Sequence, residues 1–164
     1  MKPAEGYRPC VGIMLLNPAG LVWVGKRIDT PNDLEGDWTG WSQMPQGGID
    51  ADEDPARAAH RELHEETGVR SAEIIAEAPE WYTYDFPSEV QTRSYSRYRG
   101  QTQKWFAMRF TGADDEVNIH APAGEKAEFS EWRWLPMTEL PALVVPFKRP
   151  VYDKVIAAFG HLTG

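Results

Sequence analysis

Apolar and polar residues fall into separate blocks along the first third of the chain, and this pattern predicts short strands joined by turns. Residues 8–16 and 21–27 are apolar runs that favour β-structure. The turn sequence NPAG at 17–20 separates them, which indicates a hairpin. Residues 28–42 are polar and rich in Asp, Asn and Gly, as in a loop, and 43–45 then predict a short strand.

The next block has the periodicity and the end signals of a helix. Asp54 is a natural N-cap, and Pro55 suits the first helical position because its missing N–H has no intrahelical partner there. Gly68 is a natural C-terminal stop because glycine readily adopts the left-handed conformation. Between these ends, an apolar stripe at helical spacing consists of Ala56, Ala59 and Leu63. We therefore expect a helix over 55–67.

Strands and a second helix are expected in the rest of the chain. Apolar runs predict strands near 69–77, 81–84, 104–110 and 131–135. Pro150 opens a closing amphipathic helix, whose apolar face consists of Val151, Val155, Ala158 and Phe159. The sequence shows neither an internal repeat nor a linker. This order predicts an α/β fold, an α/β/α sandwich around a mixed sheet, with residues 1–164 in a single domain.

Three acidic side chains crowd the end of the first predicted helix. Glu62, Glu65 and Glu66 stand at i, i+3 and i+4, so their carboxylates share one face. Like charges at this spacing repel by ~0.2–0.5 kcal/mol per pair. The last turn of a helix also carries the negative end of the helix dipole. A divalent cation would offset both costs, and the alternative is an ordinary solvated acidic face.

The residues around this cluster match a known pattern, the segment GGIDADEDPARAAHRELHEETGV at 47–69. Its fixed positions are Gly47, five residues, Glu53, seven residues, Arg61-Glu62-Leu63, one residue, Glu65-Glu66, one residue and Gly68-Val69. This spacing resembles the Nudix box at every defining position, which is a strong signal. The segment departs from the Nudix box at Asp52, because a glycine commonly occupies the position directly before Glu53.

The resemblance implies a loop–helix–loop that binds Mg²⁺ or Mn²⁺. The implied metal ligands are Glu62, Glu65, Glu66 and a main-chain carbonyl near Gln46. The implied supporting residues of the box are Gly47, Glu53, Arg61 and Gly68. The donor set agrees with this assignment, because carboxylate, carbonyl and water oxygens suit Mg²⁺ or Mn²⁺ better than Zn²⁺.

The resemblance extends well beyond the box. One branch of the Nudix family is similar in the blocks GYRPCVGIMLLN, QMPQGGID, VRSAEIIAEAPEWYTYDFP, QTQKWF, EFSEWRWL and VPFKRPVYDKV. That branch contains bacterial RNA pyrophosphohydrolases and the bacterial and plant asymmetrical diadenosine tetraphosphate hydrolases. The resemblance therefore implies the Nudix fold and a hydrolase that cleaves a nucleoside-linked polyphosphate by water attack at phosphorus.

Further site residues are implied position by position. Arg8 would meet phosphate oxygens, since its guanidinium is permanently charged and bidentate. Gln103, Lys104 and Lys148 would contact the polyphosphate as well. Glu128 resembles a fourth carboxylate that reaches the metals from a loop, and it or a box glutamate would accept the proton of the attacking water. For each charged residue, a solvated surface position is the alternative.

Aromatic and cationic faces are implied for nucleobase binding. Arg27 and Phe147 resemble a pair that sandwiches a base, and Tyr84 offers another stacking face. Core packing is the alternative for both aromatic residues. The segment 29–41 departs from the shorter loop of the RNA-type relatives, so contacts from this loop are not transferred.

Charge and cysteine content restrict the partners. The net charge of −8 disfavours extended duplex binding, but a polyphosphate end held by metal ions and a few cations remains compatible. Cys10 is the single cysteine, so no internal disulfide can form. The N-terminus does not resemble a secretory signal, and no apolar run approaches the ~20 residues needed to span a bilayer. We therefore expect a cytoplasmic protein without membrane partners.

These observations predict a metal-dependent pyrophosphohydrolase. Its substrate would be a dinucleoside polyphosphate, such as diadenosine tetraphosphate, or the 5′-triphosphate end of RNA. One alternative is a Nudix hydrolase of another nucleotide, such as a nucleotide sugar or an oxidised nucleotide. The other is a non-catalytic protein that binds nucleotides or RNA ends.

Overall fold

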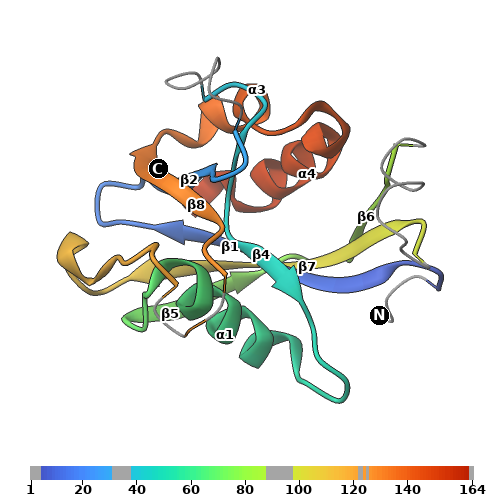
Figure 1. Cartoon of the computed structure of the whole chain (residues 1–164), viewed down its shortest axis with the longest axis horizontal. Coiled ribbons are helices and arrows are strands. Elements are labelled where there is room, and N and C mark those ends of the chain that lie inside the picture. The colour runs from blue at the N-terminus through green and yellow to red at the C-terminus, as the bar shows by residue number, and fades with distance from the viewer. Residues whose placement is uncertain (1–4, 31–37, 88–97, 122–123, 125, 163–164) are drawn as a thin grey trace.

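A single mixed sheet forms the centre of the molecule (Figure 1). The computed structural model describes residues 5–30, 38–87, 98–121, 124 and 126–162. Its strands are β1 (Arg8–Leu16), β2 (Val22–Arg27), β3 (Ser42–Gln43), β4 (Gln46–Gly48), β5 (Ala72–Glu77), β6 (Tyr82–Asp85), β7 (Gly100–Phe110) and β8 (Phe129–Leu135). Its α-helices are α1 (Pro55–Thr67), α3 (Leu140–Leu143) and α4 (Arg149–Phe159).

The predicted hairpin forms, but its two strands soon separate. The Asn17 side chain accepts hydrogen bonds from the backbone of Ala19 and Leu21, which closes the turn. Beyond the Leu16–Val22 pair, β1 runs parallel to β7 along its whole length and antiparallel to β4. Strand β2 instead pairs with β3 and β8. The centre of the sheet is therefore the β1–β7 pair, which is buried on both faces.

Helices cover both faces of the sheet, as the α/β/α sandwich predicted (Figure 1). Helix α1 packs on one face through Ala58, Ala59 and Leu63, which meet Val11, Ile13 and Leu15 of β1. Helix α4 packs on the other face, where Tyr152 meets the Trp105 ring edge to face at 5.8 Å. Because side chains alternate along β1, its odd-numbered residues serve one core and its even-numbered residues the other.

Several predicted element bounds need correction. Instead of one strand over 43–45, the structure has β3 and β4 on either side of Met44 and Pro45. Strand β5 begins at Ala72 rather than 69, while β7 and β8 begin earlier than predicted. The short helix α3 was missed, since four residues are too few to show periodicity. In the described part of the chain, no helix is long and apolar enough to cross a membrane.

Candidate active site

Helix α1 presents the glutamates at the edge of the core. The Asp54 carboxylate accepts hydrogen bonds from the backbone of Ala56 and Arg57, which fixes the first turn. Gly68 ends the helix with φ of +78°, and its N–H donates to the carbonyl of His64. With both ends fixed and Leu63 buried, the neighbouring carboxylates of Glu62 and Glu66 lie beside the sheet rather than in open solvent.

Arg61 holds the box loop to the helix. Its Nε and Nη2 donate to the two carboxylate oxygens of Glu53, each at 2.8 Å, and Nη2 also donates to the carbonyl of Gly48 at 2.8 Å. Its Nη1 donates to Glu62 at 2.8 Å and to Glu65 at 3.2 Å. This bonding lowers the pKa of Glu53 to about 2 and keeps the guanidinium charged. One side chain thus connects the loop to two of the clustered acids.

The loop itself contains a residue with positive φ. Asp52 has φ of +61°, a conformation that aspartate and asparagine adopt more readily than most non-glycine residues. This explains how the chain tolerates aspartate at the position where the Nudix box commonly has glycine. Beyond this turn, Glu53 accepts a hydrogen bond from the Asp50 backbone at 2.9 Å.

Glu62 is close to the backbone of β4, which only a glycine permits. A Cβ at Gly47 would lie 2.0 Å from Oε2 of Glu62, and one at Gly48 would lie 2.5 Å from Nη2 of Arg8. The Glu62 side chain is only 13% exposed. Burial raises the pKa of Glu62 to about 7, and the nearby Glu65 carboxylate adds to the rise. The two glycines let an acid from α1 and a cation from β1 approach the same strand.

We expect Gly47→Ala to impair the predicted hydrolase activity with little loss of stability. The added methyl group must displace the Glu62 carboxylate, and misplacing a reacting group by ~1 Å can cost about 10²-fold in rate. The kcat/KM of the variant, measured beside its Tm, tests this expectation. Gly160→Ala is the matched control, because a Cβ at Gly160 meets no atom within 4 Å. Equal kcat/KM in the two variants would contradict the role of Gly47.

Glu66 is the most strongly perturbed acid of the cluster. Its Oε2 accepts a hydrogen bond from the backbone N–H of Gln46 at 3.1 Å. Burial raises the pKa of Glu66 well above its usual range, and the negative charges of Glu62 and Glu128 raise it further. The structure therefore places the fourth predicted acid, Glu128, within electrostatic reach of the box glutamates. A cation would relieve the repulsion among these groups.

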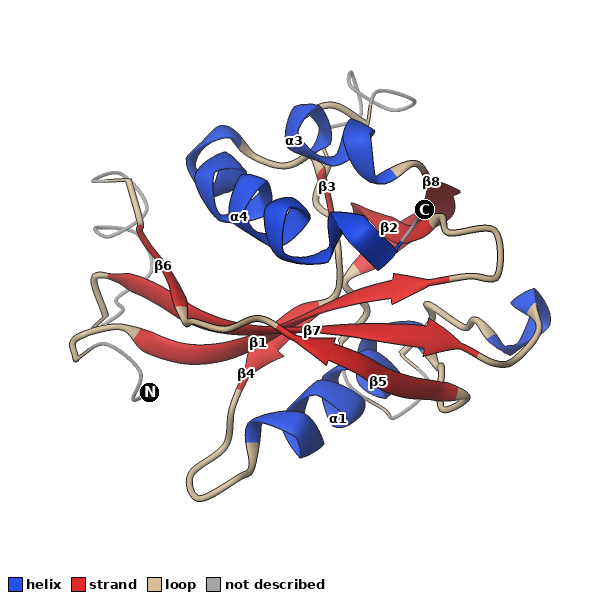
Figure 2. Ribbon diagram, turned by 180° about the vertical axis from the view of Figure 1, so that it is seen from behind, coloured by secondary structure: helices blue, strands red, loops and turns tan. Residues whose placement is uncertain are grey.

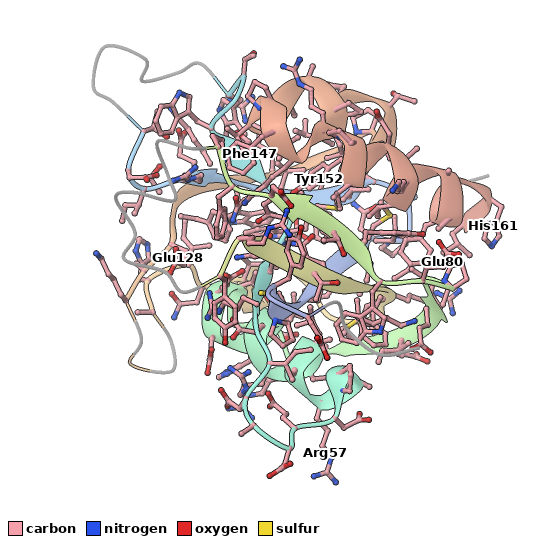
Figure 3. All side chains as sticks on the ribbon, turned by 90° about the vertical axis from the view of Figure 1, so that its right-hand side faces the viewer. Arg57, Glu80, Glu128, Phe147, Tyr152 and His161 are labelled. Atoms are coloured by element: carbon pink, nitrogen blue, oxygen red, sulfur yellow. The ribbon has the colours of Figure 1, made fainter. Side chains whose placement is uncertain are left out.

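The acids line an open cleft of about 350 Å³. Its lining residues are Arg8, Gln43, Gln46, Gly47, Gly48, Glu62, Glu65, Glu66, Gln101, Lys126 and Glu128. Figure 3 shows Glu128 at the boundary between the helical layer that carries Phe147 and the layer that contains α1. The cleft thus combines acids from α1 and a loop with cations from β1 and from the segment that precedes β8.

The donor chemistry of the cleft fits a divalent cation. Among the described residues, no three acid, histidine or cysteine side chains converge into a ready-made metal site, since Arg61 binds Glu62 and Glu65 directly. Four carboxylates nevertheless line the same cleft. Burial disfavours the ionised forms of Glu62 and Glu66 and therefore raises the pKa of each. Oxygen donors with uncompensated negative charge suit a hard cation.

Gln103 has a different environment from the one predicted. Its side chain is 1% exposed, and its amide donates to Gln46 Oε1 at 2.7 Å and to Gln101 Oε1 at 2.9 Å. Its carbonyl accepts from the indole N–H of Trp105 at 2.9 Å. The structure therefore does not place Gln103 at the cleft surface. Its contacts instead hold Gln46 and Gln101, two residues that do line the cleft.

Lys104 likewise does not reach the cleft. Its ammonium group donates to the carbonyl of Ala78 at 2.6 Å and lies 3.4 Å from the Glu77 carboxylate. These partners occupy β5 and its end, and Lys104 is not among the residues that line the cleft. A direct polyphosphate contact by this side chain would require both interactions to break.

Of the predicted base-binding residues, Tyr84 and Phe147 contact each other, whereas Arg27 has other partners. Phe147 packs against the Tyr84 ring at 5.6 Å, and the Lys148 ammonium lies 5.9 Å from that ring. Arg27 pairs with Asp29 and lies over the Trp41 ring at 5.5 Å. Tyr84 is 7% exposed, so only part of its face is accessible. The segment 31–37 of the adjoining loop is outside the described residues.

Sequence reasoning did not identify three other residues of the cleft. Gln43, Gln101 and Lys126 line the cleft, and Gln43 accepts a hydrogen bond from Lys148 at 3.4 Å. These residues come from β3, from β7 and from the segment before β8, which meet only in the folded molecule, so spacing along the chain does not reveal them. Gln101 stands two residues before Gln103 on β7, on the same side of the strand, and this alternation was the one available signal.

Comparisons with known proteins identify the family of the chain. The model of the NUDIX domain family matches residues 6–155. An RNA pyrophosphohydrolase of Afipia carboxidovorans is 57% identical over 159 residues, covering 96% of this chain and 95% of its own. The RNA pyrophosphohydrolase of Mesorhizobium japonicum is 56% identical over 158 residues, covering 95% of this chain and 91% of its own.

Solved structures of more distant proteins share the fold. The E. coli dihydroneopterin triphosphate pyrophosphohydrolase is similar with a TM-score of 0.64 at 16% identity, covering 92% of this chain and 97% of its own. A C. elegans Ap4A hydrolase in a binary complex is similar with a TM-score of 0.60 at 16% identity, covering 93% and 98%. At this identity the likeness concerns the fold alone.

Proposed function

The chain belongs to the Nudix family and is a pyrophosphohydrolase, and we propose that it acts on the 5′-triphosphate end of RNA. The observation that carries this proposal is one cleft lined by four carboxylates and Arg8, in a chain 57% identical to an RNA pyrophosphohydrolase over nearly its full length. A triphosphate end concentrates negative charge, so it needs cations and cationic side chains together. An RNA substrate would also place the protein in the cytoplasm.

The proposed cofactor is Mg²⁺ or Mn²⁺. Glu62, Glu65 and Glu66 would hold it, together with Glu128 and the main-chain carbonyl of Gln46. When bound, such ions neutralise the phosphates and lower the pKa of a coordinated water. Nudix hydrolases generally use divalent metals, and the oxygen donors of this cleft favour these two over zinc.

The remaining groups of the site would orient the phosphates and accept a proton. Arg8 lies against Gly48 at the cleft wall, where its planar guanidinium can bind a phosphate bidentately. Lys148 is buried and does not line the cleft, but its ammonium donates to the cleft residue Gln43 at 3.4 Å, so its charge would act on the phosphates from behind the cleft wall. One of the carboxylates, Glu128 or a box glutamate, would accept the proton of the attacking water through an oxygen that is not bound to an ion. Gln46 fixes Glu66 through its N–H and is itself held by Gln103.

Dinucleoside polyphosphates are the second proposed substrate class. They present the same phosphate chain, and the Tyr84–Phe147 pair beside the cleft offers a stacking surface for a base. The two substrates differ in the group attached beyond the phosphates, which is a nucleotide strand in one and a second nucleoside in the other. Kinetics must therefore separate them.

The test offers triphosphorylated RNA, diadenosine tetraphosphate and a nucleotide sugar to the purified protein in parallel, each with Mg²⁺. We expect kcat/KM to be highest for the RNA, with the nucleotide sugar lowest. A preference for diadenosine tetraphosphate would replace the RNA assignment by the second one. The highest rate on the nucleotide sugar would overturn both. Products formed in ¹⁸O-labelled water would identify the phosphorus that is attacked.

Binding of the polyphosphate is expected to weaken above pH 8. Burial lowers the pKa of Lys148 to about 8, and the positive charge of Arg27 lowers it further. Below that pH the side chain is an ammonium that attracts phosphate, and above it the amine is neutral, so KM should rise with pH. KM measured from pH 7 to 9.5 tests this, with Lys148→Met as the comparison. An identical pH dependence of KM in the variant would contradict this role.

A further inference from the structure

Strand β8 lies at the margin of the sheet, beyond β2 (Figure 2). Within the described ranges, β8 pairs with β2 and with no other strand. An edge strand presents a row of main-chain N–H and C=O groups that can pair with another chain. The strand has seven residues, and a register shift opposite Lys26 and Arg27 leaves residues 131–135 as its regularly paired part.

The hydrogen bonds of β2 identify which groups of β8 face outward. The N–H of Arg27 donates to Trp41 on the side of β3, whereas the N–H of Ile28 donates to the carbonyl of Glu128 on the side of β8. Because N–H and C=O directions alternate along a strand, Lys26 and Val24 also face β8. Their partners in the register are Glu131 and Arg133. The main-chain groups of Trp132 and Trp134 therefore point away from β2, toward the open edge.

Two opposite charges flank Trp132 on one face of β8. Glu131 is 51% exposed and lies 3.6 Å from the ammonium of Lys26. Arg133 is exposed and lies over the Trp38 ring at 4.3 Å, which holds its guanidinium in place. Charges on edge strands usually prevent self-pairing, because equal charges then meet across the new ladder. Here the two signs differ, so the outcome depends on the register.

An antiparallel pair of β8 strands centred on Trp132 makes these charges complementary. Trp132 would then face Trp132 of the second copy through the outward N–H and C=O groups. In the same register, Glu131 of each copy stands opposite Arg133 of the other, which forms two cross-strand ion pairs. The sequence of the strand is thus complementary to itself under a two-fold axis, as an isologous contact requires.

We propose that β8 is a self-association edge through which two copies of this chain form one continuous sheet. The contact is short, so the dimer should form in a concentration-dependent way. The dimer contact would also restrict the motion of the start of β8. This strand directly follows the cleft residue Glu128, whose carbonyl accepts a hydrogen bond from the N–H of Ile28. The proposal depends on the β8 edge alone and does not rest on the assigned substrate.

Charge reversals test the register directly in analytical ultracentrifugation. We expect the unmodified protein to dimerise as its concentration rises. Glu131→Arg and Arg133→Glu should each weaken the dimer at least tenfold, since equal charges then face each other at both pairs. An equimolar mixture of the two variants should dimerise again, because each copy now carries the charge that the other lacks. The double swap should dimerise for the same reason.

Several results would overturn the proposal. A monomer at every concentration would do so, as would dimers of equal strength in both single variants or a mixture that remains monomeric. The Tm of each variant and its kcat/KM on a polyphosphate, both measured at concentrations where the unmodified protein is monomeric, control for folding, since neither Glu131 nor Arg133 lines the cleft. If Glu131→Arg loses its fold through Lys26, Arg133→Glu decides, and undiminished dimerisation of that variant would overturn the proposal.

Discussion

Glu66→Gln is expected to lower kcat/KM by ~10²–10⁴, the range for loss of a positioned ionisable group in a catalytic site. The variant keeps the shape of the side chain, and its amide oxygen can still accept the hydrogen bond from Gln46. It removes the charge that would bind the cation. Steady-state kinetics with Mg²⁺ on the preferred polyphosphate measure the effect. Unchanged turnover in a folded variant would contradict the role assigned to Glu66.

The same substitution should leave the protein as stable as before or more stable. Burial and the charges of Glu62 and Glu128 raise the pKa of Glu66, so the folded state disfavours its anion. A carboxyl group with a raised pKa stabilises the fold at low pH and loses that contribution as the pH rises through the shifted value. The gain in Tm from Glu66→Gln, measured with a chelator, should therefore be larger at pH 8 than at pH 5. A lower Tm would indicate a structural role instead.

Arg61→Lys should destabilise the fold and reduce activity together. Lysine keeps the charge but lacks the planar fork that binds Glu53, the Gly48 carbonyl and Glu62 at once. Losing these charge-assisted hydrogen bonds on a side chain that is 28% exposed should cost about 1–3 kcal/mol. For a chain of this size, that corresponds to a fall in Tm of roughly 2–10 °C.

Arg57→Lys is the matched control for this prediction. Arg57 lies on the same helix, four residues earlier, and Figure 3 shows it at the outer end of α1. Its substitution should change Tm and kcat/KM little. If Arg61→Lys were as mild as Arg57→Lys, neither the loop nor the glutamates would depend on the hydrogen bonds of Arg61.

The sequence predicted the elements with local signals and missed those that depend on the folded sheet. Asp54, Pro55 and Gly68 determine the ends of α1 through local caps, so its bounds could be read directly from the chain. The early strands were found because their apolar runs are long. The split between β3 and β4 was missed, since strands of two and three residues carry no periodicity.

In the candidate site, too, the features with local sequence signals were predicted, and those that depend on the folded sheet were not. The box glutamates lie within one helix, so their shared face followed from spacing, and the structure places them along one cleft with Arg8 and Glu128. For Gln103 and Lys104, family resemblance gave a polyphosphate role, whereas the structure shows internal hydrogen bonds. No spacing rule predicts which polar residue of a strand is satisfied by its neighbours in the folded sheet. The contact of Gly47 with Glu62 also required coordinates.

The central claim is that the glutamates of α1 hold divalent cations, and calorimetric titration with Mn²⁺ tests it most directly. We expect binding to the unmodified protein with release of protons, because the pKa of Glu62 is raised to about 7 and that of Glu66 is raised as well. Replacing Glu62, Glu65 and Glu66 together by Gln should weaken binding by at least about tenfold and abolish the proton release. Equal Mn²⁺ affinity in that folded triple variant would contradict the claim.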